Sequence, residues 1–476
     1  MLRALVIFAG CFALIWATSR WRQALEAALV MLVVEGAVRK WLLPGAQDLV
    51  YFAKDALLLG VYFGYFRERA QLRMRMKVPP GVTLPLLISA GFGALQIFNP
   101  ALPNVLVGVL GFKAYFLYVP LLWVVPAAFR TDRDLARFLK RYLLLAIPVG
   151  LLAVAQFRSP SDSPLNVYAR GNTTEITTFG SSSQVRVTGT FSYITGYSSY
   201  VLTMAILVLA VLAATRWQLR RNTFTYAALL LTLLGMLMTG SRGPVFMLAL
   251  LLPLYAWLGF SGERGTSGLG RFLFGAGVIA MLTNYVGADA VEAFYGRASG
   301  AADLSGRLAA PLLQPFHALE RAGMLGYGIG ATHQMAAAVA KSPVPYGWLE
   351  GAMVEGEGGQ IMLELGPLGF LLIYFLRIFL VFYAGRMVGR MRTTFHRAIC
   401  TSCVLFFLAH LPGGVVFNIT ADVYYWFFGG LLFAIAHLDA VASAAATPQT
   451  APRPVPPPRR APPVQGRPVW GPVESP

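Results

Sequence analysis

The chain has 476 residues, of which 57% are hydrophobic and only 13% are charged, and its formal net charge is +18. A soluble domain of this length cannot bury so much apolar surface, so the composition excludes an ordinary soluble protein and indicates that lipid is the solvent. The apolar runs lack the alternation of a transmembrane barrel. The expected class is an all-α, polytopic integral membrane protein.

The apolar runs predict about 12 to 13 transmembrane helices, because most of them approach the roughly 20 apolar residues that span a bilayer. In chain order, the expected spans are 2–17, 24–37, 48–66, 81–98, 104–128, 141–157, 195–215, 223–239, 243–260, 272–287, 359–384, 396–412 and 420–437.

The connections between these spans predict the orientation of the chain. Four of them are strongly basic and fall on one side when the spans are counted in order: 67–77, 130–141, 216–221 and 386–397. Lys and Arg in short connections stay in the cytoplasm, so this side is expected to be cytoplasmic. The positive charge then reflects orientation and attraction to anionic headgroups, and we expect no nucleic-acid partner.

The opposite side carries two long connections, and connections of this length usually carry function. The second of them contains helix-compatible sequence over 304–322, followed by glycines at 326, 328 and 330. The tail is rich in Pro, Ala and Arg and is expected to be disordered and cytoplasmic. The chain is thus divided into an amino-terminal transmembrane bundle (1–157), a first extracytoplasmic loop (158–194), central helices (195–287), a large extracytoplasmic loop with short helices (288–358), carboxy-terminal helices (359–439) and the tail (440–476).

Several ionisable residues lie within or beside the spans, where charge is costly and therefore a sign of function. Those on the side of the long loops are Glu35, Arg39, Lys54, Asp55, Lys113, Arg242, Glu364, His410 and Asp422. Lys54 and Asp55 are adjacent and do not share a helix face, so we expect their partners on other spans, with Lys113 as the partner of Asp55. Arg377 lies near the opposite end of its span, and we expect it to snorkel to the headgroups.

Arginines in the connections indicate an anion site on the same side. The turn 239–244 holds Arg242 between small residues, and Arg307 directly precedes helix-compatible sequence; Arg297 and Arg321 add positive charge. Guanidinium groups suit bidentate contacts with phosphate. The alternative for each loop arginine is a solvated surface charge.

These pieces, in this order, resemble the O-antigen ligase and O-antigen polymerase superfamily of bacterial membrane glycosyltransferases. The segments that carry the resemblance are Arg186–Phe191, Ser241–Gly243, Gly306–Arg307, the loop glycines, and Glu364–Gly369. The resemblance implies that a sugar hydroxyl attacks a glycan carried by undecaprenyl pyrophosphate outside the inner membrane, without nucleotide sugar, metal or other cofactor. It also implies that periplasmic arginines hold the pyrophosphate, and Arg242 and Arg307 occupy the matching positions.

One departure from the superfamily favours a polymerase. Ligases usually carry a His before the Glu-Leu-Gly motif, at the position that Glu355 occupies here. We therefore expect a polymerase of O-antigen, capsule or exopolysaccharide repeat units, with ligation to lipid A core as the alternative. Glu355 and Glu357 are the candidate catalytic residues, with Glu355 as general base. Simple balance of nearby basic charge explains both carboxylates as well.

The expected substrate-binding residues are Arg186, Arg242, Arg307, Arg321, Lys54, Lys113 and Glu364. The expected partners are an undecaprenyl-pyrophosphate-linked oligosaccharide, the lipid bilayer and other polysaccharide-assembly proteins. A transporter or flippase of an anionic lipid-linked substrate also explains the charges within the spans. The placement of both long loops on one side favours chemistry there. An assembly scaffold that recruits partners through the tail leaves the polar residues unexplained.

Overall fold

The computed structural model describes residues 2–72, 78–169, 176–180, 183–215, 222–260, 266–299, 304–340, 356–446 and 471. Within these residues the fold is all-helical, and the one β-bridge, between Thr178 and Val185, is isolated. The helices are α1 (Leu2–Ser19), α2 (Trp21–Ala37), α3 (Gln47–Tyr51), α4 (Ala53–Leu72), α5 (Pro80–Gln96), α6 (Val105–Phe116), α7 (Leu121–Ala128), α8 (Asp132–Leu143), α9 (Ala146–Arg158), α10 (Ile194–Ala214), α11 (Thr223–Met238), α12 (Arg242–Phe260), α13 (Thr266–Val286), α14 (Ala288–Ser299), α15 (Leu304–Ala322), α16 (Ala336–Ala340), α17 (Glu357–Val388), α18 (Thr394–Ala409) and α19 (Ile419–Ala446). The all-α prediction is confirmed, and α15 covers the expected 304–322 segment.

Length and composition allow six of the described helical segments to cross a membrane. A seventh results if Phe272–Val286 and Ala288–Ala298, which meet at 92°, form one broken span. Five further apolar helices are shorter, with 10–17 residues. Every predicted span coincides with one or two helices. The chain therefore has the helices of a multi-pass membrane protein.

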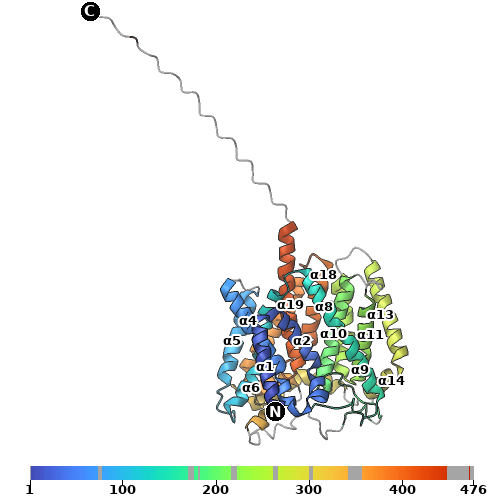
Figure 1. Ribbon diagram of the computed structural model, residues 1–476, viewed down its shortest axis with the longest axis horizontal. Coiled ribbons are helices and arrows are strands. Elements are labelled where there is room, and N and C mark those ends of the chain that lie inside the picture. The colour runs from blue at the N-terminus through green and yellow to red at the C-terminus, as the bar shows by residue number, and fades with distance from the viewer. Residues whose placement is uncertain are drawn as a thin grey trace, which may run out of the picture.

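Apolar side chains fill the centre of the bundle and also cover its outside. Helix α10 is the most enclosed of the long apolar helices, because 83% of the residues in its most apolar stretch are buried. It lies among the other helices in Figure 1. On outer helices, Phe8, Phe274 and Met281 are 76%, 76% and 75% exposed. An exterior of this kind suits hydrocarbon and would be an aggregation surface in water.

One end of the bundle gathers the basic connections. Glu68, near the end of α4, lies 3.8 Å from Arg130, just before α8. His396, near the start of α18, contacts Asp132 of α8 at 2.9 Å. Helix α8 and the end of α19 mark this end in Figure 1, and α14 lies toward the opposite end. Three of the basic connections therefore meet as predicted, and 216–221 lies outside the described residues.

Helix α19 continues to Ala446, so the predicted boundary at residue 440 between helix and tail is wrong. The sequence there is Val-Ala-Ser-Ala-Ala-Ala, and alanine has the highest helix propensity of all residues. The proline-rich residues 447–470 and 472–476 lie outside the described residues.

Helix α17 is broken near its start, and the break brings two distant residues together. Gly366 has φ +65°, a left-handed conformation that favours glycine, and Pro367 follows it. Glu357 and Arg377 form a buried ion pair although they are 20 residues apart, which is about 30 Å along a straight helix. The expectation that Arg377 snorkels is therefore wrong, because the break turns the start of α17 back and brings a carboxylate to it.

Candidate functional site

Two hydrogen bonds from the Arg186 side chain hold the turn between α11 and α12, and Gly240 in this turn makes room for them. The Arg186 Nε donates to the Thr239 carbonyl at 2.8 Å, and its Nη2 donates to the Ser241 hydroxyl at 3.3 Å. Gly240 has φ +63°, and a Cβ there would lie 2.9 Å from the Arg186 Nε. Only glycine therefore allows Arg186 to lie across the turn at this distance.

Two more arginines converge on the same turn. Arg242 opens α12 and donates from Nη2 to the Arg297 carbonyl, and the Arg297 Nε donates to the Gly240 carbonyl at 3.1 Å. We call Arg186, Arg242 and Arg297 the arginine cluster. Burial lowers the pKa of Arg186, and the positive charges of Arg297 and Arg242 lower it further. The cluster thus concentrates positive charge beside partly desolvated backbone.

Two of these arginines lack an acidic partner among the described residues. No described carboxylate lies within ion-pair distance of Arg186 or Arg242. The Arg242 Nε is buried and has no hydrogen-bond partner among the described residues. Buried donors are normally satisfied, so an unpaired guanidinium N–H in such a place is a candidate contact for an anion.

A cavity of about 670 Å³ is lined in part by residues of the first long loop, which also contains Arg186. Tyr168 and Thr177 line it, and the backbone N–H of Arg186 donates to the Thr177 carbonyl at 2.9 Å. The backbone of Arg186 therefore lies next to a residue of the cavity wall, and the three arginines are not themselves among the described residues that line the cavity. The polar side chains on its walls include Glu35, Arg39, Tyr51, Lys54, Lys113 and His333.

Four of the ionisable residues predicted within the spans form two ion pairs, and one or both members of each pair line this cavity. Lys113 lies 2.6 Å from Asp55, which confirms the predicted pair, and Lys54 lies 2.6 Å from Glu35 on another helix. The Tyr118 hydroxyl also donates to Asp55 at 2.7 Å. The Lys54 side chain is only 2% exposed, whereas that of Lys113 is 21% exposed. Of the two lysines predicted to bind substrate, Lys113 is thus the accessible one.

Glu364 is fully occupied by protein contacts. One carboxylate oxygen accepts from the N–H and the hydroxyl of Thr332, both at 2.8 Å, and the other accepts from the Tyr115 hydroxyl at 2.9 Å. The residue is 0% exposed. These contacts tie the glycine-containing loop and α6 to the break in α17, so they support a structural role rather than the expected contact with substrate.

The loop glycines explain why that loop sits so close to the break. Tyr327 and Gly328 donate to the carbonyls of Leu363 and Glu364 at 2.8 and 2.9 Å, so they cap the first part of α17. A Cβ on Gly326 would lie 2.5 Å from the Glu364 carbonyl oxygen. The Gly-x-Gly-x-Gly pattern therefore provides close backbone approach.

Glu357 is also engaged on both oxygens. It pairs with Arg377, and its second oxygen accepts from the backbone N–H groups of Val415 and Val416 at 2.5 and 2.7 Å. A carboxylate with all these partners is poorly placed to accept a proton from an acceptor hydroxyl. The contacts therefore do not favour Glu357 as a catalytic group. Glu355 lies outside the described residues.

The two remaining arginines predicted to bind substrate lie on α15. The side chain of Arg307 is outside the described residues, although its backbone belongs to the first turns of the helix. Arg321, in the last turn, is exposed, and its carbonyl accepts from the Tyr327 hydroxyl at 3.0 Å. Nothing in the described contacts brings Arg321 to the cavity.

His333, in the second long loop, also lines the cavity. Burial and the nearby Lys113 lower its pKa to about 4, so the ring is neutral at pH 7. Its Nδ1 accepts from the Met335 N–H at 3.1 Å, which leaves the proton on Nε2. His333 therefore offers a hydrogen-bond donor for an oxygen of a bound ligand.

Lys40 lies in the π-helical turn Val38–Leu42 that follows α2 and holds the first long loop against this turn, and its burial leads us to expect a pH effect on stability. Its Nζ donates to the Thr188 hydroxyl at 2.7 Å and to the Gly189 carbonyl at 2.9 Å, and burial lowers its pKa from 10.5 to about 7. At pH values between these two pKa values, Lys40 is protonated in the unfolded chain and neutral in the folded protein. The unfolded chain therefore binds more protons, so stability rises with pH.

We therefore expect the thermal midpoint to rise by about 2 to 4 °C between pH 7 and 9.5 in wild type, relative to Lys40→Met. Scanning calorimetry of the purified proteins measures this difference. The exposed Lys140→Met variant should follow wild type. An identical pH dependence in wild type and Lys40→Met would contradict the assignment.

Searches against models of protein families, curated proteins and solved structures give no match to this chain. The segments that carry the sequence resemblance do contact one another in two groups: Arg186 with the turn at Ser241, and the loop glycines with the break at Glu364 and Gly366. Function is therefore inferred from this geometry together with the resemblance.

Proposed function

We propose that this chain is a multi-pass glycosyltransferase of the bacterial inner membrane that polymerises undecaprenyl-pyrophosphate-linked repeat units for O-antigen, capsule or exopolysaccharide. One observation carries the proposal. Arg186 and Arg242 converge on the turn between α11 and α12 without a described carboxylate partner, and the backbone of Arg186 adjoins the wall of a cavity that is lined by several charged side chains. A pyrophosphate supplies the negative charge and the oxygen pairs that two guanidinium groups bind best.

The same proposal includes the topology of the bundle. The shorter apolar helices cross the membrane together with the long ones, which gives about 12 to 13 spans. The basic end faces the cytoplasm, and the cavity opens on the other side. The lipid-linked substrate then reaches the cavity from the outer leaflet, where its pyrophosphate lies at the depth of the arginine cluster.

The reaction needs one bond formed and one broken. A sugar hydroxyl of one unit attacks the anomeric carbon of the glycan on a second unit, and the bond from that carbon to the phosphate oxygen breaks. Undecaprenyl pyrophosphate leaves, and the hydroxyl proton passes to a base. The cluster stabilises the negative charge that develops on the leaving group. Arg307 and the accessible Lys113 add positive charge, and Glu355 is the proposed base.

Two other functions share parts of this site. A ligase would use the same donor and transfer the glycan to lipid A core. A transporter of an anionic lipid-linked substrate is favoured by one observation, the ion pairs Glu35–Lys54 and Asp55–Lys113 along the cavity, because paired charges within spans also mark substrate pathways.

An experiment with the protein reconstituted in liposomes distinguishes a polymerase, a ligase and a transporter. Purified protein in liposomes is given a lipid-linked oligosaccharide, and the products are scored for chain length, with and without lipid A core. We expect longer lipid-linked chains without any second acceptor. Transfer only to lipid A core would identify a ligase, and movement of the substrate between leaflets without a new glycosidic bond would identify a transporter.

A further inference from the structure

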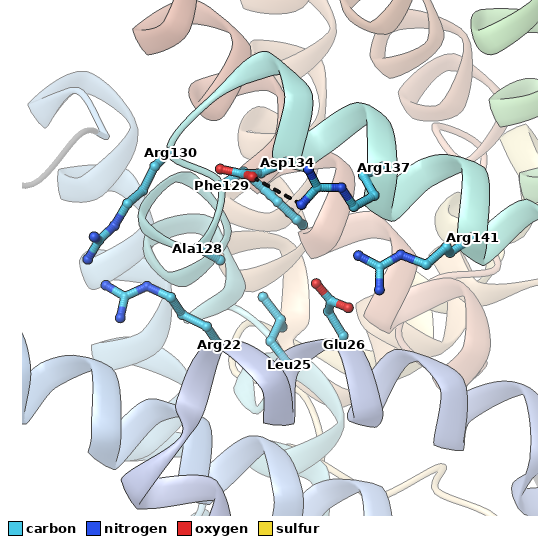
Figure 2. A pocket seen from close by; sticks show the side chains of 9 residues that line it. All are labelled: Arg22, Leu25, Glu26, Ala128, Phe129, Arg130, Asp134, Arg137 and Arg141. Atoms are coloured by element: carbon cyan, nitrogen blue, oxygen red, sulfur yellow. Dashed lines mark ion pairs between the residues drawn. The ribbon is translucent and has the colours of Figure 1, made fainter.

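A second pocket, of about 310 Å³, lies at the basic end of the bundle. It is formed by α2, the connection after α7, and α8, and Figure 2 shows its arginine side chains around the opening. Helix α2 runs from Arg22 in this pocket to Glu35 in the cavity wall, so the two sites lie at its opposite ends. The charged lining residues are Arg22, Arg130, Arg137, Arg141, Glu26 and Asp134.

Four arginines and two carboxylates line the pocket, and Glu68, outside the lining, pairs with Arg22 and Arg130, so the arginines still outnumber the carboxylates around them. Arg137 lies 3.8 Å from Asp134, and their side chains are 63% and 44% exposed. A long, exposed pair of this kind holds its arginine only weakly. Arg141 forms no ion pair with any described residue. The two arginines of α8 that line the pocket, Arg137 and Arg141, therefore have N–H donors to offer a ligand.

Arg22 is held differently and gives the pocket a fixed wall. It makes two hydrogen bonds to Glu68, at 2.8 and 3.0 Å, and stacks over the Trp21 ring at 4.2 Å. Its Nε is buried and has no hydrogen-bond partner among the described residues. The pocket thus combines one rigid guanidinium with others that can close on a ligand.

The position of the pocket at the start of an apolar segment points to a lipid as its ligand. Its floor is apolar, formed by Leu25, Ala128 and Phe129, and Leu25 and Phe129 are 0% and 4% exposed. Helix α8 begins the segment Asp132–Arg158, which is long and apolar enough to cross a membrane. The arginines thus lie where a span begins, at the depth of phospholipid headgroups.

We propose that this pocket binds the phosphodiester headgroup of an anionic glycerophospholipid. Arg137 and Arg141 contact the phosphate oxygens, and Glu26 accepts from a headgroup hydroxyl, as a glycerol headgroup would provide. Basic pockets between helices on the cytoplasmic side suit such headgroups, since guanidinium groups pair with phosphate bidentately. The proposal is independent of the glycan chemistry at the other end of the bundle.

The test compares two double variants of the full-length protein. Arg137→Gln/Arg141→Gln removes two charges from the pocket, and Arg133→Gln/Lys140→Gln removes two exposed charges from the same helix outside it. Each purified protein, in uncharged detergent, is titrated with short-chain phosphatidylglycerol or phosphatidylcholine, and bound lipids are counted by native mass spectrometry. The thermal midpoint without lipid verifies that each variant is folded, and Arg141→Gln alone serves if the double variant is not.

We expect wild type to prefer phosphatidylglycerol, the pocket variant to bind it about tenfold more weakly, and the control to bind it like wild type. Equal binding by wild type and the pocket variant would overturn the proposal. An equal loss in the control would also overturn it, because the attraction would then be a general charge effect. Displacement of the lipid by an equal concentration of inorganic phosphate would identify a free-phosphate site instead.

Discussion

Replacing Arg242 with alanine is expected to lower the rate of glycosidic bond formation by about a hundredfold or more, because one charge-assisted contact to a leaving pyrophosphate is worth about 2 to 4 kcal/mol in the transition state. Arg186→Ala should have a comparable effect, since its guanidinium group donates to Ser241, the residue that precedes Arg242. Arg242→Lys should rescue little, because an ammonium group cannot make the bidentate contact. Initial rates with purified protein measure these effects.

The matched control is Arg158→Ala. Arg158 ends α9 on the same side of the bundle, its side chain is exposed, and it lies outside the arginine cluster. This variant should retain the wild-type rate. Near wild-type rates in folded Arg186→Ala and Arg242→Ala would contradict the assignment of the cluster to the donor.

Breaking the pair between Glu357 and Arg377 is expected to cost about 3 to 5 kcal/mol of stability, because each change leaves an uncompensated charge or unpaired donors in the interior. Both side chains are 4% exposed, and Glu357 also holds the Val415 and Val416 N–H groups. Glu357→Gln and Arg377→Met should therefore lower the thermal midpoint and the yield of folded protein.

This prediction separates a structural Glu357 from a catalytic one. In the structural role, Glu357→Gln loses stability, while the rate per folded molecule stays within a few-fold of wild type. The exposed Glu320→Gln on α15 should change neither quantity. A Glu357→Gln protein with a normal midpoint and no activity would instead restore the catalytic assignment.

The apolar helices of this protein could be predicted because lipid-facing and core positions are both apolar, so hydropathy alone marks the position of each predicted span. The pairing of Asp55 with Lys113 could be predicted as well. Adjacent Lys54 and Asp55 point to different faces, and each buried charge needs a partner on another helix. In the sequence, Arg186, Arg242 and Arg297 were separate loop arginines. Their convergence depends on tertiary packing.

The roles of Glu357, Glu364 and Arg377 could not be predicted, because they depend on the break in α17. The Gly366-Pro367 dipeptide does mark a helix interruption. It does not tell which way the chain turns, and that direction decides whether Glu357 faces a substrate or Arg377. The glycines of the second loop were predicted only as part of a long connection, whereas the Gly328 N–H caps α17 through the Glu364 carbonyl.

The most direct measurement of the central claim counts undecaprenyl pyrophosphate released against glycosidic bonds formed by the purified protein, with one lipid-linked oligosaccharide as the only glycan. The proposed reaction gives one released pyrophosphate lipid for each new bond, and Arg242→Ala lowers both counts together. Chain growth without release of undecaprenyl pyrophosphate, or uptake of the lipid-linked oligosaccharide without any new bond, would contradict it.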